Sequence, residues 1–158
     1  MKDRNDETKP SRERILGSKD IEGVPDRHAV EATEGEEALF VYGLLQPGES
    51  LYDVLAPYVT GLVVDAYVCG CRMYASSFPL AVAGESGDRV WGTLLFLKEA
   101  EAVFPRVDEI ESAYDRVMVE VQTPDNKVGA WMYVYGGKPY GEFVESGDFI
   151  AWRDNHGR

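Results

Sequence analysis

The chain contains little of the residue types that build metal sites and histidine-based catalytic triads. It has two cysteines and two histidines in 158 residues, and His28 and His156 both lie in polar terminal segments. The chain therefore has too few cysteines and histidines to form a zinc site or a histidine-activated nucleophile, and we expect no bound metal. Cys69 and Cys71 stand two residues apart, where a strand would place both on one face and too close for an easy disulfide. We expect two buried free thiols in preference to a redox pair.

Positive charge is also scarce, because 16 lysines and arginines face 28 aspartates and glutamates and leave a net charge of −12. Nucleic acids and anionic membrane surfaces attract basic proteins, so neither is an expected partner. No apolar run approaches the length that spans a bilayer, and the N-terminus lacks the apolar region of a signal peptide. These absences predict a cytoplasmic protein. The sequence does not indicate an oligomeric state.

What the chain does contain is typical of one globular domain. Apolar residues make up 44% and charged residues 28% of a length that is sufficient for a real core. Residues 1–37 are polar, carry both charge signs and show no sustained apolar period. This segment is predicted to be a disordered or loosely docked extension. We expect the folded domain to span residues 38–153.

The most informative stretch runs from Leu39 to Gly48. Its apolar beginning predicts a buried strand that breaks at Gly43, followed by a turn and then by a helix start signal at Ser50. A glycine that ends a strand in this way leaves backbone N–H groups pointing in one direction, so the loop is a candidate anion cradle. An ordinary exit from a sheet fits the spacing equally well. A helix of a couple of turns is predicted next, because apolar residues share one helical face: Leu51, Val54, Leu55 and Tyr58.

The rest of the chain predicts an α+β domain, in which strands are separated by short helices. The expected elements are strands over residues 60–75 (one or two, with a bend or bulge at Gly70), 90–96, 114–123 and 128–135, and a helix over 98–111. Pro105 conflicts with that helix and is expected either to kink it or to begin a second short helix. The last two strands alternate in polarity around a short turn, which predicts a β-hairpin.

The segment Val41-Tyr42-Gly43-Leu44-Leu45 resembles the Y-G-x-L signature of the γ-glutamylcyclotransferase-like (AIG2-like) family. Further segments similar to that family follow in its order: Phe78-Pro79-Leu80-Ala81-Val82, Val90-Trp91-Gly92-Thr93-Leu94, Val107-Asp108-Glu109-Ile110-Glu111, Tyr114-Asp115-Arg116 and Ser146-Gly147-Asp148. The resemblance covers about residues 38–150 and implies a small closed mixed β-barrel flanked by a few short helices. Two positions depart from the family pattern: Leu44 replaces a small hydroxyl residue, and Ser112 replaces a glycine.

The resemblance implies a γ-glutamyl cyclotransferase, which releases 5-oxoproline and a free amine or amino acid from a small γ-glutamyl substrate without a cofactor. Glu111 aligns with the catalytic glutamate of the family, whereas acids at a helix end are by themselves usually only solvated. The implied substrate-binding residues lie on the exit of the first strand and on the hairpin: Tyr42, Gly43, Leu44, Leu45, Gln46, Tyr114 and Tyr135.

Several alternatives remain open at the level of sequence. The departures at Leu44 and Ser112 also suit a non-catalytic binding or regulatory module on the same fold. Another amide-transfer or cyclising step on a γ-glutamylated intermediate is compatible with the same residues. Tyr42 is expected either in the core or at the site, and Arg116 either pairs with an acid such as Asp108 or reaches the substrate carboxylate.

Overall fold

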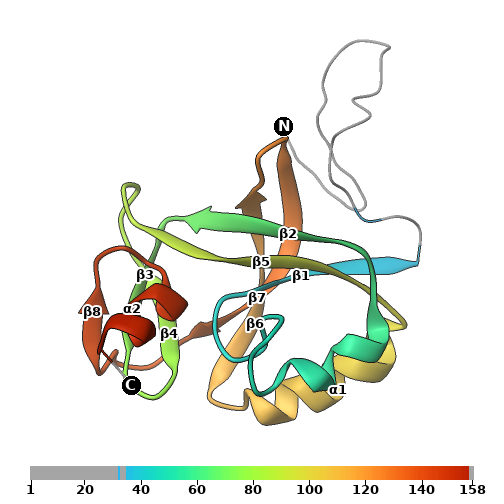
Figure 1. The fold of residues 1–158 in the computed structure, drawn as a ribbon, viewed down its shortest axis with the longest axis horizontal. Helices are drawn as coiled ribbons and strands as arrows, with labels where there is room; N and C mark the ends of the chain where they lie inside the picture. Colours follow the sequence, from blue (N-terminus) through green and yellow to red (C-terminus); the bar gives the residue numbers. More distant parts are fainter. Residues whose placement is uncertain (1–31, 33–34, 157–158) are drawn as a thin grey trace.

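The computed structural model describes residue 32 and residues 35–156 (Figure 1). The expected N-terminal extension lies mostly outside the described residues, although the first strand already begins at Glu36. The elements are, in chain order, β1 (Glu36–Val41), η1 (Tyr52–Val54), η2 (Ala56–Tyr58), β2 (Val59–Cys69), β3 (Cys71–Ala75), β4 (Pro79–Ala83), β5 (Arg89–Lys98), α1 (Ala100–Ile110), β6 (Tyr114–Gln122), β7 (Lys127–Tyr135), β8 (Glu142–Val144) and α2 (Phe149–His156).

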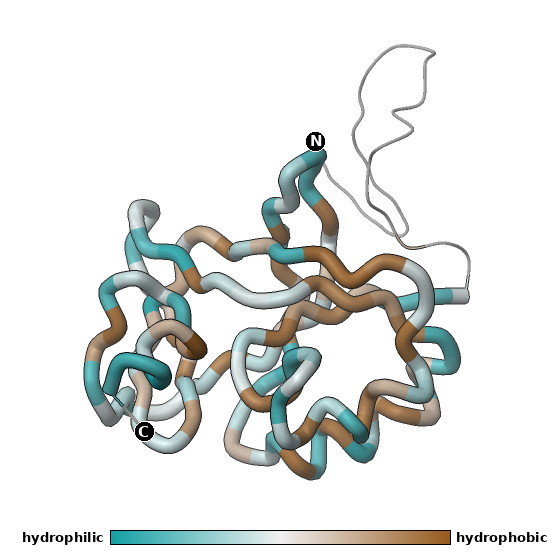
Figure 2. The backbone as a smooth tube through the Cα atoms, viewed as in Figure 1, coloured by the Kyte–Doolittle hydropathy of each residue, from teal (hydrophilic) through white to brown (hydrophobic). Residues whose placement is uncertain are grey.

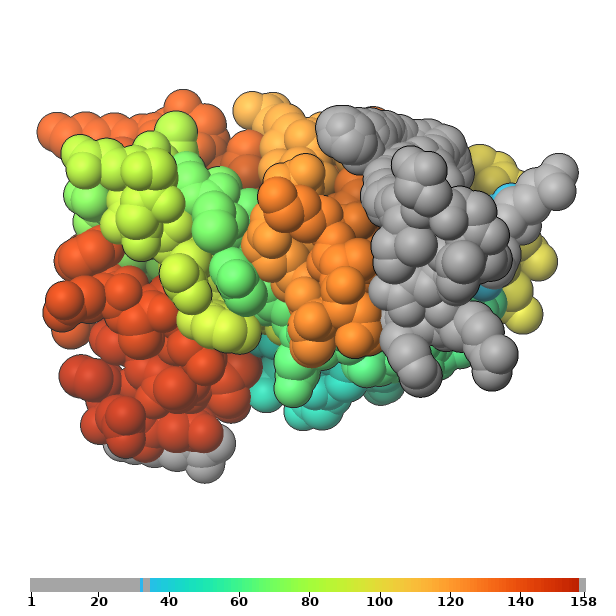
Figure 3. Space-filling model, turned by 90° about the horizontal axis from the view of Figure 1, so that it is seen from above, coloured from blue at the N-terminus to red at the C-terminus, as the bar shows by residue number. Residues whose placement is uncertain are grey.

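The strands form a closed barrel in the order β1-β5-β2-β6-β7 and a smaller sheet in the order β4-β3-β8. Neighbouring barrel strands are antiparallel except β1 and β7, which run parallel and close the barrel. The structure therefore confirms the α+β fold with a small closed mixed barrel. Figure 3 shows the C-terminal segment (red) beside the β3 and β4 segments (yellow-green) at one end of the molecule.

Both faces of β1 are covered, which explains why its sequence reads as an uninterrupted apolar run. Phe40 belongs to the larger core cluster together with Leu94 and Met132. Leu39 and Val41 point the other way and belong to a second cluster, which includes the buried side of α1. Figure 2 shows the resulting hydrophobic segments (brown) along the barrel strands and on α1. This strand is therefore anchored on both sides immediately before it reaches Tyr42.

The helix α1 is one continuous element despite the proline inside it. Its buried residues are Ala100, Val103, Phe104 and Val107, which face the second core cluster. Pro105 is exposed, so the backbone carbonyl that it leaves without an intrahelical donor can be solvated. The expectation of a second short helix is therefore wrong. A single helix runs to Ile110, and its C-terminal end lies beside the barrel.

The helix predicted after Ser50 is wrong, because the structure has two short 3-10 turns, η1 and η2, in its place. Ser50 does not cap either turn, and Leu51 precedes η1 without a side-chain cap. Pro57 lies in the first turn of η2, where its missing N–H costs nothing, but it prevents an α-helix from running through. The apolar residues still face one core, and Leu55 is fully buried.

Of the bend or bulge expected at Gly70, the structure shows a bend, which separates two strands that belong to different sheets. Gly70 has a φ of +87°, a conformation that L side chains rarely adopt. Cys69 therefore ends β2 while Cys71 begins β3, so they do not share the face of one strand. Both cysteines are free, but Cys69 is exposed and Cys71 is half-buried. The expectation of two buried thiols was therefore wrong.

The predicted hairpin is confirmed as β6 and β7, whose register runs from Tyr114 opposite Tyr135 to Gln122 opposite Lys127. Tyr114 and Tyr135 consequently face each other where the hairpin opens. The chain then forms β8 and α2, where the sequence had indicated only a short segment packing back near Trp152. Phe149 of α2 is 1% exposed and joins the larger core cluster, so the C-terminal helix is part of the domain.

Candidate active site

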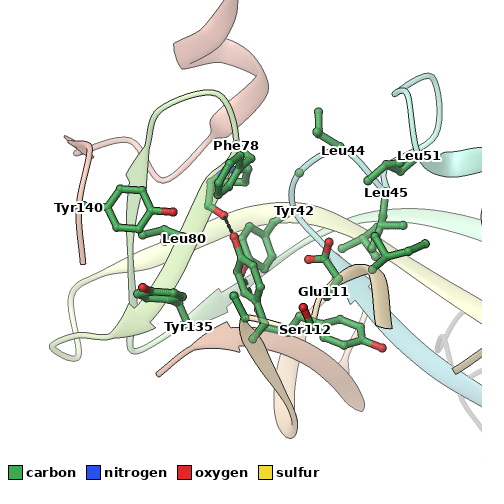
Figure 4. Close-up of a pocket in the computed structure, with 17 residues that line it drawn as sticks. Tyr42, Leu44, Leu45, Leu51, Phe78, Leu80, Glu111, Ser112, Tyr135 and Tyr140 are labelled. Carbon is green, nitrogen blue, oxygen red and sulfur yellow. Dashed lines mark hydrogen bonds between the residues drawn. The ribbon is translucent and has the colours of Figure 1, made fainter. Parts of the chain in front are cut away.

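A cavity of about 300 Å³ opens between the exit of β1, the start of β4, the end of α1 and the open end of the hairpin (Figure 4). Of the residues that the sequence assigned to a site, it is lined by Tyr42, Gly43, Leu44, Leu45, Glu111, Tyr114 and Tyr135. Gln46 is not among the lining residues. Segments that are up to about a hundred residues apart in the chain therefore meet around one space.

Glu111 is positioned by the backbone on both sides of it. Its N–H donates to the carbonyl of Val107 at 2.8 Å, and its carbonyl accepts the N–H of Tyr114 at 2.9 Å. Figure 4 shows its carboxyl directed into the cavity. Within the described part of the chain, this carboxyl makes no hydrogen bond and no ion pair. The carboxyl therefore faces the cavity with its lone pairs available.

Burial raises the pKa of the Glu111 carboxyl above its ordinary value. The residue also directly follows α1, and the C-terminal end of a helix carries partial negative charge. This charge disfavours the carboxylate as well, so both effects act in the same direction. A carboxyl in this setting can take up and release a proton closer to neutral pH than a solvated glutamate can.

Asp108 holds the end of α1 against the hairpin, one helical turn before Glu111. Arg116 donates to it twice, from Nε to Oδ1 at 3.0 Å and from Nη2 to Oδ2 at 3.2 Å. The hydroxyl of Tyr133 donates to the same carboxyl at 2.6 Å. The hydrogen bonds from Arg116 are the main reason that the pKa of Asp108 lies below its ordinary value.

Of the two roles considered for Arg116, the structure supports the pairing with Asp108. Its guanidinium lies 4.2 Å from the ring centroid of Phe104 and 4.7 Å from that of Trp131, so it packs against both rings on the outer side of the barrel. Arg116 does not line the cavity. It therefore positions α1 and the hairpin relative to each other.

The loop after β1 is braced so that its backbone borders the cavity. Gln46 donates from its backbone N–H to the carbonyl of Gly43 at 3.1 Å, and its side-chain Oε1 accepts from the Thr93 hydroxyl at 3.0 Å. These contacts engage both the backbone and the side chain of Gln46, which does not line the cavity. Within residues 35–156, the amide N–H groups of Gly43, Leu44 and Leu45 have no acceptor. All three residues line the cavity, so their N–H groups are free backbone donors at its border.

Gly43 is required by close contact. A Cβ atom at this position would lie 2.7 Å from Cγ and 2.9 Å from Cδ of Pro79, closer than Cβ atoms approach such neighbours in proteins. The strand exit therefore passes directly against the first residue of β4. Only glycine lets the backbone of the loop come this near without displacing β4.

Tyr42 combines the two roles that the sequence left open, because it is 6% exposed and also lines the cavity. Its hydroxyl donates to the carbonyl of Tyr133 at 2.6 Å and accepts the N–H of Ala81 at 3.3 Å. Burial raises the pKa of this hydroxyl, so Tyr42 is a neutral hydrogen-bonding group. It ties the exit of β1 to β7 and β4.

Tyr114 and Tyr135 form part of a row of aromatic rings. The Tyr114 hydroxyl donates to the carbonyl of Pro79 at 2.8 Å, and burial raises its pKa. The Tyr135 ring stands edge-on to Tyr114 at 5.8 Å and to Tyr140 at 5.9 Å between centroids. This row extends the cavity wall away from Glu111.

Several lining residues were missed by sequence reasoning, notably Phe78, Ser112, Tyr133 and Tyr140. Phe78 lies within a segment that resembles the family, and Tyr133 lies two residues before Tyr135 on the same strand. The sequence could therefore have indicated Phe78 and Tyr133 as lining residues. Tyr140 comes from the loop between β7 and β8, and no pattern in the sequence indicates that this loop folds over the hairpin.

The C-terminal helix also reaches the loop after β1. Arg153 of α2 donates to the carboxylate of Glu49 through Nη1 at 2.5 Å and through Nη2 at 3.2 Å. The two side chains are 24% and 16% exposed. Since Glu49 precedes Leu51, which lines the cavity, this ion pair braces the outer side of the loop.

Two kinds of feature are absent from the part of the chain that the structure describes. Residue 32 and residues 35–156 contain no group of three or more His, Cys, Asp or Glu side chains that could hold a metal ion. No helix in these ranges is both long and apolar enough to cross a membrane. The polar groups around the cavity are one carboxyl, several phenols, a serine hydroxyl and backbone amides.

Comparison with known proteins gives consistent matches. PH0828 from Pyrococcus horikoshii, which carries the name "Putative gamma-glutamylcyclotransferase", is 31% identical over 111 residues, covering 69% of this chain and 87% of the relative. Its crystal structure, described as that of an uncharacterized protein, matches at 28% identity with a TM-score of 0.60. That match covers 76% of this chain and 95% of the other.

Two further structures have the same fold. At3g28950.1 from Arabidopsis thaliana matches with a TM-score of 0.56 at 29% identity, over 81% of this chain and 79% of the other. An AIG2-like protein from Mus musculus matches with a TM-score of 0.52 at 22% identity, over 70% of this chain and 89% of the other, which shows the fold alone. The model of one family, described as gamma-glutamyl cyclotransferase, AIG2-like, matches residues 39–153, a range that contains Glu111 and the loop after β1. The chain therefore belongs to the gamma-glutamyl cyclotransferase, AIG2-like family.

Proposed function

We propose that this protein is a γ-glutamyl cyclotransferase, which converts a small γ-glutamyl compound into 5-oxoproline and a free amine or amino acid. The observation that carries the proposal is the carboxyl of Glu111. It points into a cavity that is bordered on another side by the free amide N–H groups of the loop after β1. Family membership supplies the reaction class, and this geometry supplies groups suited to it.

The reaction is an internal transfer that needs no redox partner and no water. The α-amine nitrogen of the γ-glutamyl group attacks its own γ-carbonyl carbon, which forms a new C–N bond and closes a five-membered ring. The bond between that carbon and the departing nitrogen breaks. Glu111 accepts the proton that the attacking amine loses and donates it to the departing nitrogen, as general base and then general acid. Atoms and charge balance without any further reactant.

The surroundings of Glu111 suit this double role. Proton transfer in both directions is most efficient when the pKa of the catalytic group lies near the working pH, and burial moves the pKa of Glu111 that way. The second task of the site is to hold the substrate curled, because ring closure depends on orientation. The amides of Gly43, Leu44 and Leu45 are suited to bind the substrate α-carboxylate or the oxyanion that develops on the γ-carbonyl.

A direct test is the release of 5-oxoproline from γ-glutamyl-alanine, γ-glutamyl amines and glutathione. In the variant Glu111→Gln, kcat should fall by about 100-fold or more, because the amide cannot transfer the proton. Glu109→Gln is the matched control, since Glu109 is an exposed acid on α1 outside the cavity lining. Release of no 5-oxoproline by folded protein from any of these compounds would argue against the proposal, as would full activity of Glu111→Gln.

A second candidate is a non-catalytic binding or regulatory module on the same fold. It is favoured by one observation: both departures from the family pattern, Leu44 and Ser112, line the cavity. Binding of γ-glutamyl compounds to the wild-type protein with no turnover, and with unchanged affinity in Glu111→Gln, would support this candidate. Loss of turnover on that substitution would support the enzyme.

A further inference from the structure

The two ends of the cavity differ in chemistry. At one end the Glu111 carboxyl lies near the loop that carries Leu44 and Leu45, whereas Tyr135 and Tyr140 form the opposite side (Figure 4). Phe78 and Tyr140 remain 38% and 47% exposed although they are large and aromatic. Exposed rings at the mouth of a cavity are typical of a surface that covers an apolar or aromatic group of a ligand.

The cavity has no positive side chain among its lining residues in the described part of the chain. Its single ionisable acid is Glu111, and the other polar groups are phenols and one serine hydroxyl. Arg116 is held by Asp108 on the outer side of the barrel. Lys138 is the cation nearest to Tyr140 in sequence, but it is exposed and does not line the cavity.

The position of the γ-glutamyl group follows from the proposed function, on which this inference rests. Both reacting atoms, the α-amine nitrogen and the γ-carbonyl carbon, must lie within reach of Glu111, and the free amides beside it take the negative oxygens. The departing part of the substrate must therefore extend toward the aromatic end. A second carboxylate placed against these rings would lose part of its hydration without gaining a cationic partner, and it would also be repelled by the charged Glu111.

We propose that the departing group is an arylalkylamine without a carboxylate, so that the substrate is a γ-glutamyl arylalkylamide. Its ring packs against Phe78, Tyr135 and Tyr140. The bond that breaks joins the γ-carbonyl carbon to the amine nitrogen, which leaves with the proton from Glu111. The structure thus assigns these three rings as specificity-determining residues for the departing group.

Matched substrate pairs test the two parts of this proposal. γ-Glutamyl-phenethylamine and γ-glutamyl-phenylalanine differ by one carboxylate, and γ-glutamyl-ethylamine and γ-glutamyl-alanine differ in the same way without a ring. We expect kcat/KM to be about ten-fold or more higher for the member of each pair that lacks the carboxylate. The phenethylamine compound should exceed the ethylamine compound by about three- to ten-fold.

Variants locate the effect. Tyr140→Ala should lower kcat/KM for γ-glutamyl-phenethylamine by about three- to ten-fold more than it lowers kcat/KM for γ-glutamyl-ethylamine, which has no ring to lose the contact. Phe143→Ala is the matched control, because Phe143 is an aromatic residue of 43% exposure that does not line the cavity. Lys138→Gln should leave all four substrates unaffected. Selective loss of the two carboxylate-bearing substrates in Lys138→Gln would show that a cation serves the departing group and would overturn the proposal.

The outcomes separate this inference from the proposed function. If γ-glutamyl-phenylalanine reacts as well as γ-glutamyl-phenethylamine, the inference is wrong while the cyclotransferase proposal stands. If none of the four compounds releases 5-oxoproline, the cyclotransferase proposal fails, and calorimetric titration of the wild-type protein with the same compounds then decides the inference. Tighter binding of γ-glutamyl-phenethylamine than of γ-glutamyl-phenylalanine supports it, and equal or weaker binding overturns it.

Discussion

At the scale of single residues, Glu111 occupies an environment that favours its uncharged form. Its carboxyl is half-buried, follows the negative end of a helix and lacks a partner among the described residues. An unpaired carboxylate in such a place costs folding free energy. Catalytic groups are commonly kept in environments that do not stabilise the fold, so removing the charge should reveal that cost.

The stability of Glu111→Gln should therefore exceed that of the wild type at pH 7.5. The folded-state pKa of the carboxyl is raised above its unfolded value of about 4.3. The folded state thus binds the proton more tightly than the unfolded state does. The stability that this proton binding gives to the wild type is present at acidic pH and is lost as pH rises through the folded pKa. Urea unfolding at pH 4, 6 and 7.5 measures this. The gap between variant and wild type should widen with pH, and a gap independent of pH would contradict the argument.

Gly43→Ala tests the close approach of the loop to β4. The new Cβ would lie 2.7 Å from Pro79 Cγ, so the loop or β4 must shift. We expect a loss of about 1–3 kcal/mol in unfolding free energy, together with a higher KM, because the amide donors move. Gly87→Ala is the control, since a Cβ there meets nothing within 4 Å. Equal behaviour of the two variants in thermal unfolding and kinetics would refute the role of Gly43.

Sequence reasoning at this scale depended on whether a residue sits in a recognisable motif. Glu111 could be selected among three neighbouring acids only through the family resemblance, because helix-end acids otherwise look alike. The backbone loop was indicated by Gly43 itself. Gln46 was assigned to the site, but its side chain accepts a hydrogen bond from Thr93, a contact between the loop after β1 and a distant strand that no local pattern encodes. Tyr140 was missed for the same reason.

At the scale of elements, the end of α1 and the hairpin behave as one unit. Asp108 accepts hydrogen bonds from Arg116 and Tyr133, and Glu111 follows one helical turn later. The Asp108 side chain is 43% exposed, so solvent weakens the ion pair. Its main consequence is geometric: it fixes the angle at which α1 presents Glu111 to the cavity.

Asp108→Ala should cost about 1–2 kcal/mol of unfolding free energy after allowing for this screening. If Asp108 positions Glu111, kcat should fall several-fold while KM changes little, because the loop proposed to bind substrate is untouched. Steady-state kinetics and urea unfolding measure the two effects. Glu109→Ala, on the same helix and without these partners, serves as the control. A change in KM alone would argue that Asp108 acts on substrate binding.

Elements with long regular patterns were predictable, and those shaped by proline were not. The hairpin was predicted because both strands alternate over nine residues each. The helix after Ser50 was predicted from spacing that equally suits successive 3-10 turns, and Pro57 decides between them. In α1, Pro105 is tolerated because it faces solvent, which only the packing of the helix reveals.

At the scale of the whole molecule, closure of the barrel assembles the site. β1 and β7 pair in parallel through Leu39 with Trp131 and Phe40 with Met132, although about ninety residues separate them. This pairing brings the loop after Gly43 beside the hairpin. Periodicity predicts each strand but carries no information on pairing over such distances, so closure was implied only by the family resemblance.

Arg153→Ala tests whether the C-terminal helix supports the site across this distance. Loss of the bidentate contact with Glu49 should lower the unfolding free energy by about 1–2 kcal/mol, because both side chains are mostly buried. KM should rise as the loop loosens. The control is Lys127→Ala, which removes the exposed ion pair with Glu120 and should cost less than about 0.5 kcal/mol. Equal costs for the two variants in thermal unfolding would contradict this role.

The wall of tyrosines has an optical consequence. All three tryptophans, Trp91, Trp131 and Trp152, lie outside the cavity lining, so their fluorescence is expected to stay nearly constant when the cavity fills. Phe78→Trp would introduce an indole at the rim, and its emission would then report occupancy against a steady background. Ligand binding could be followed in this way without labels and for compounds that never react.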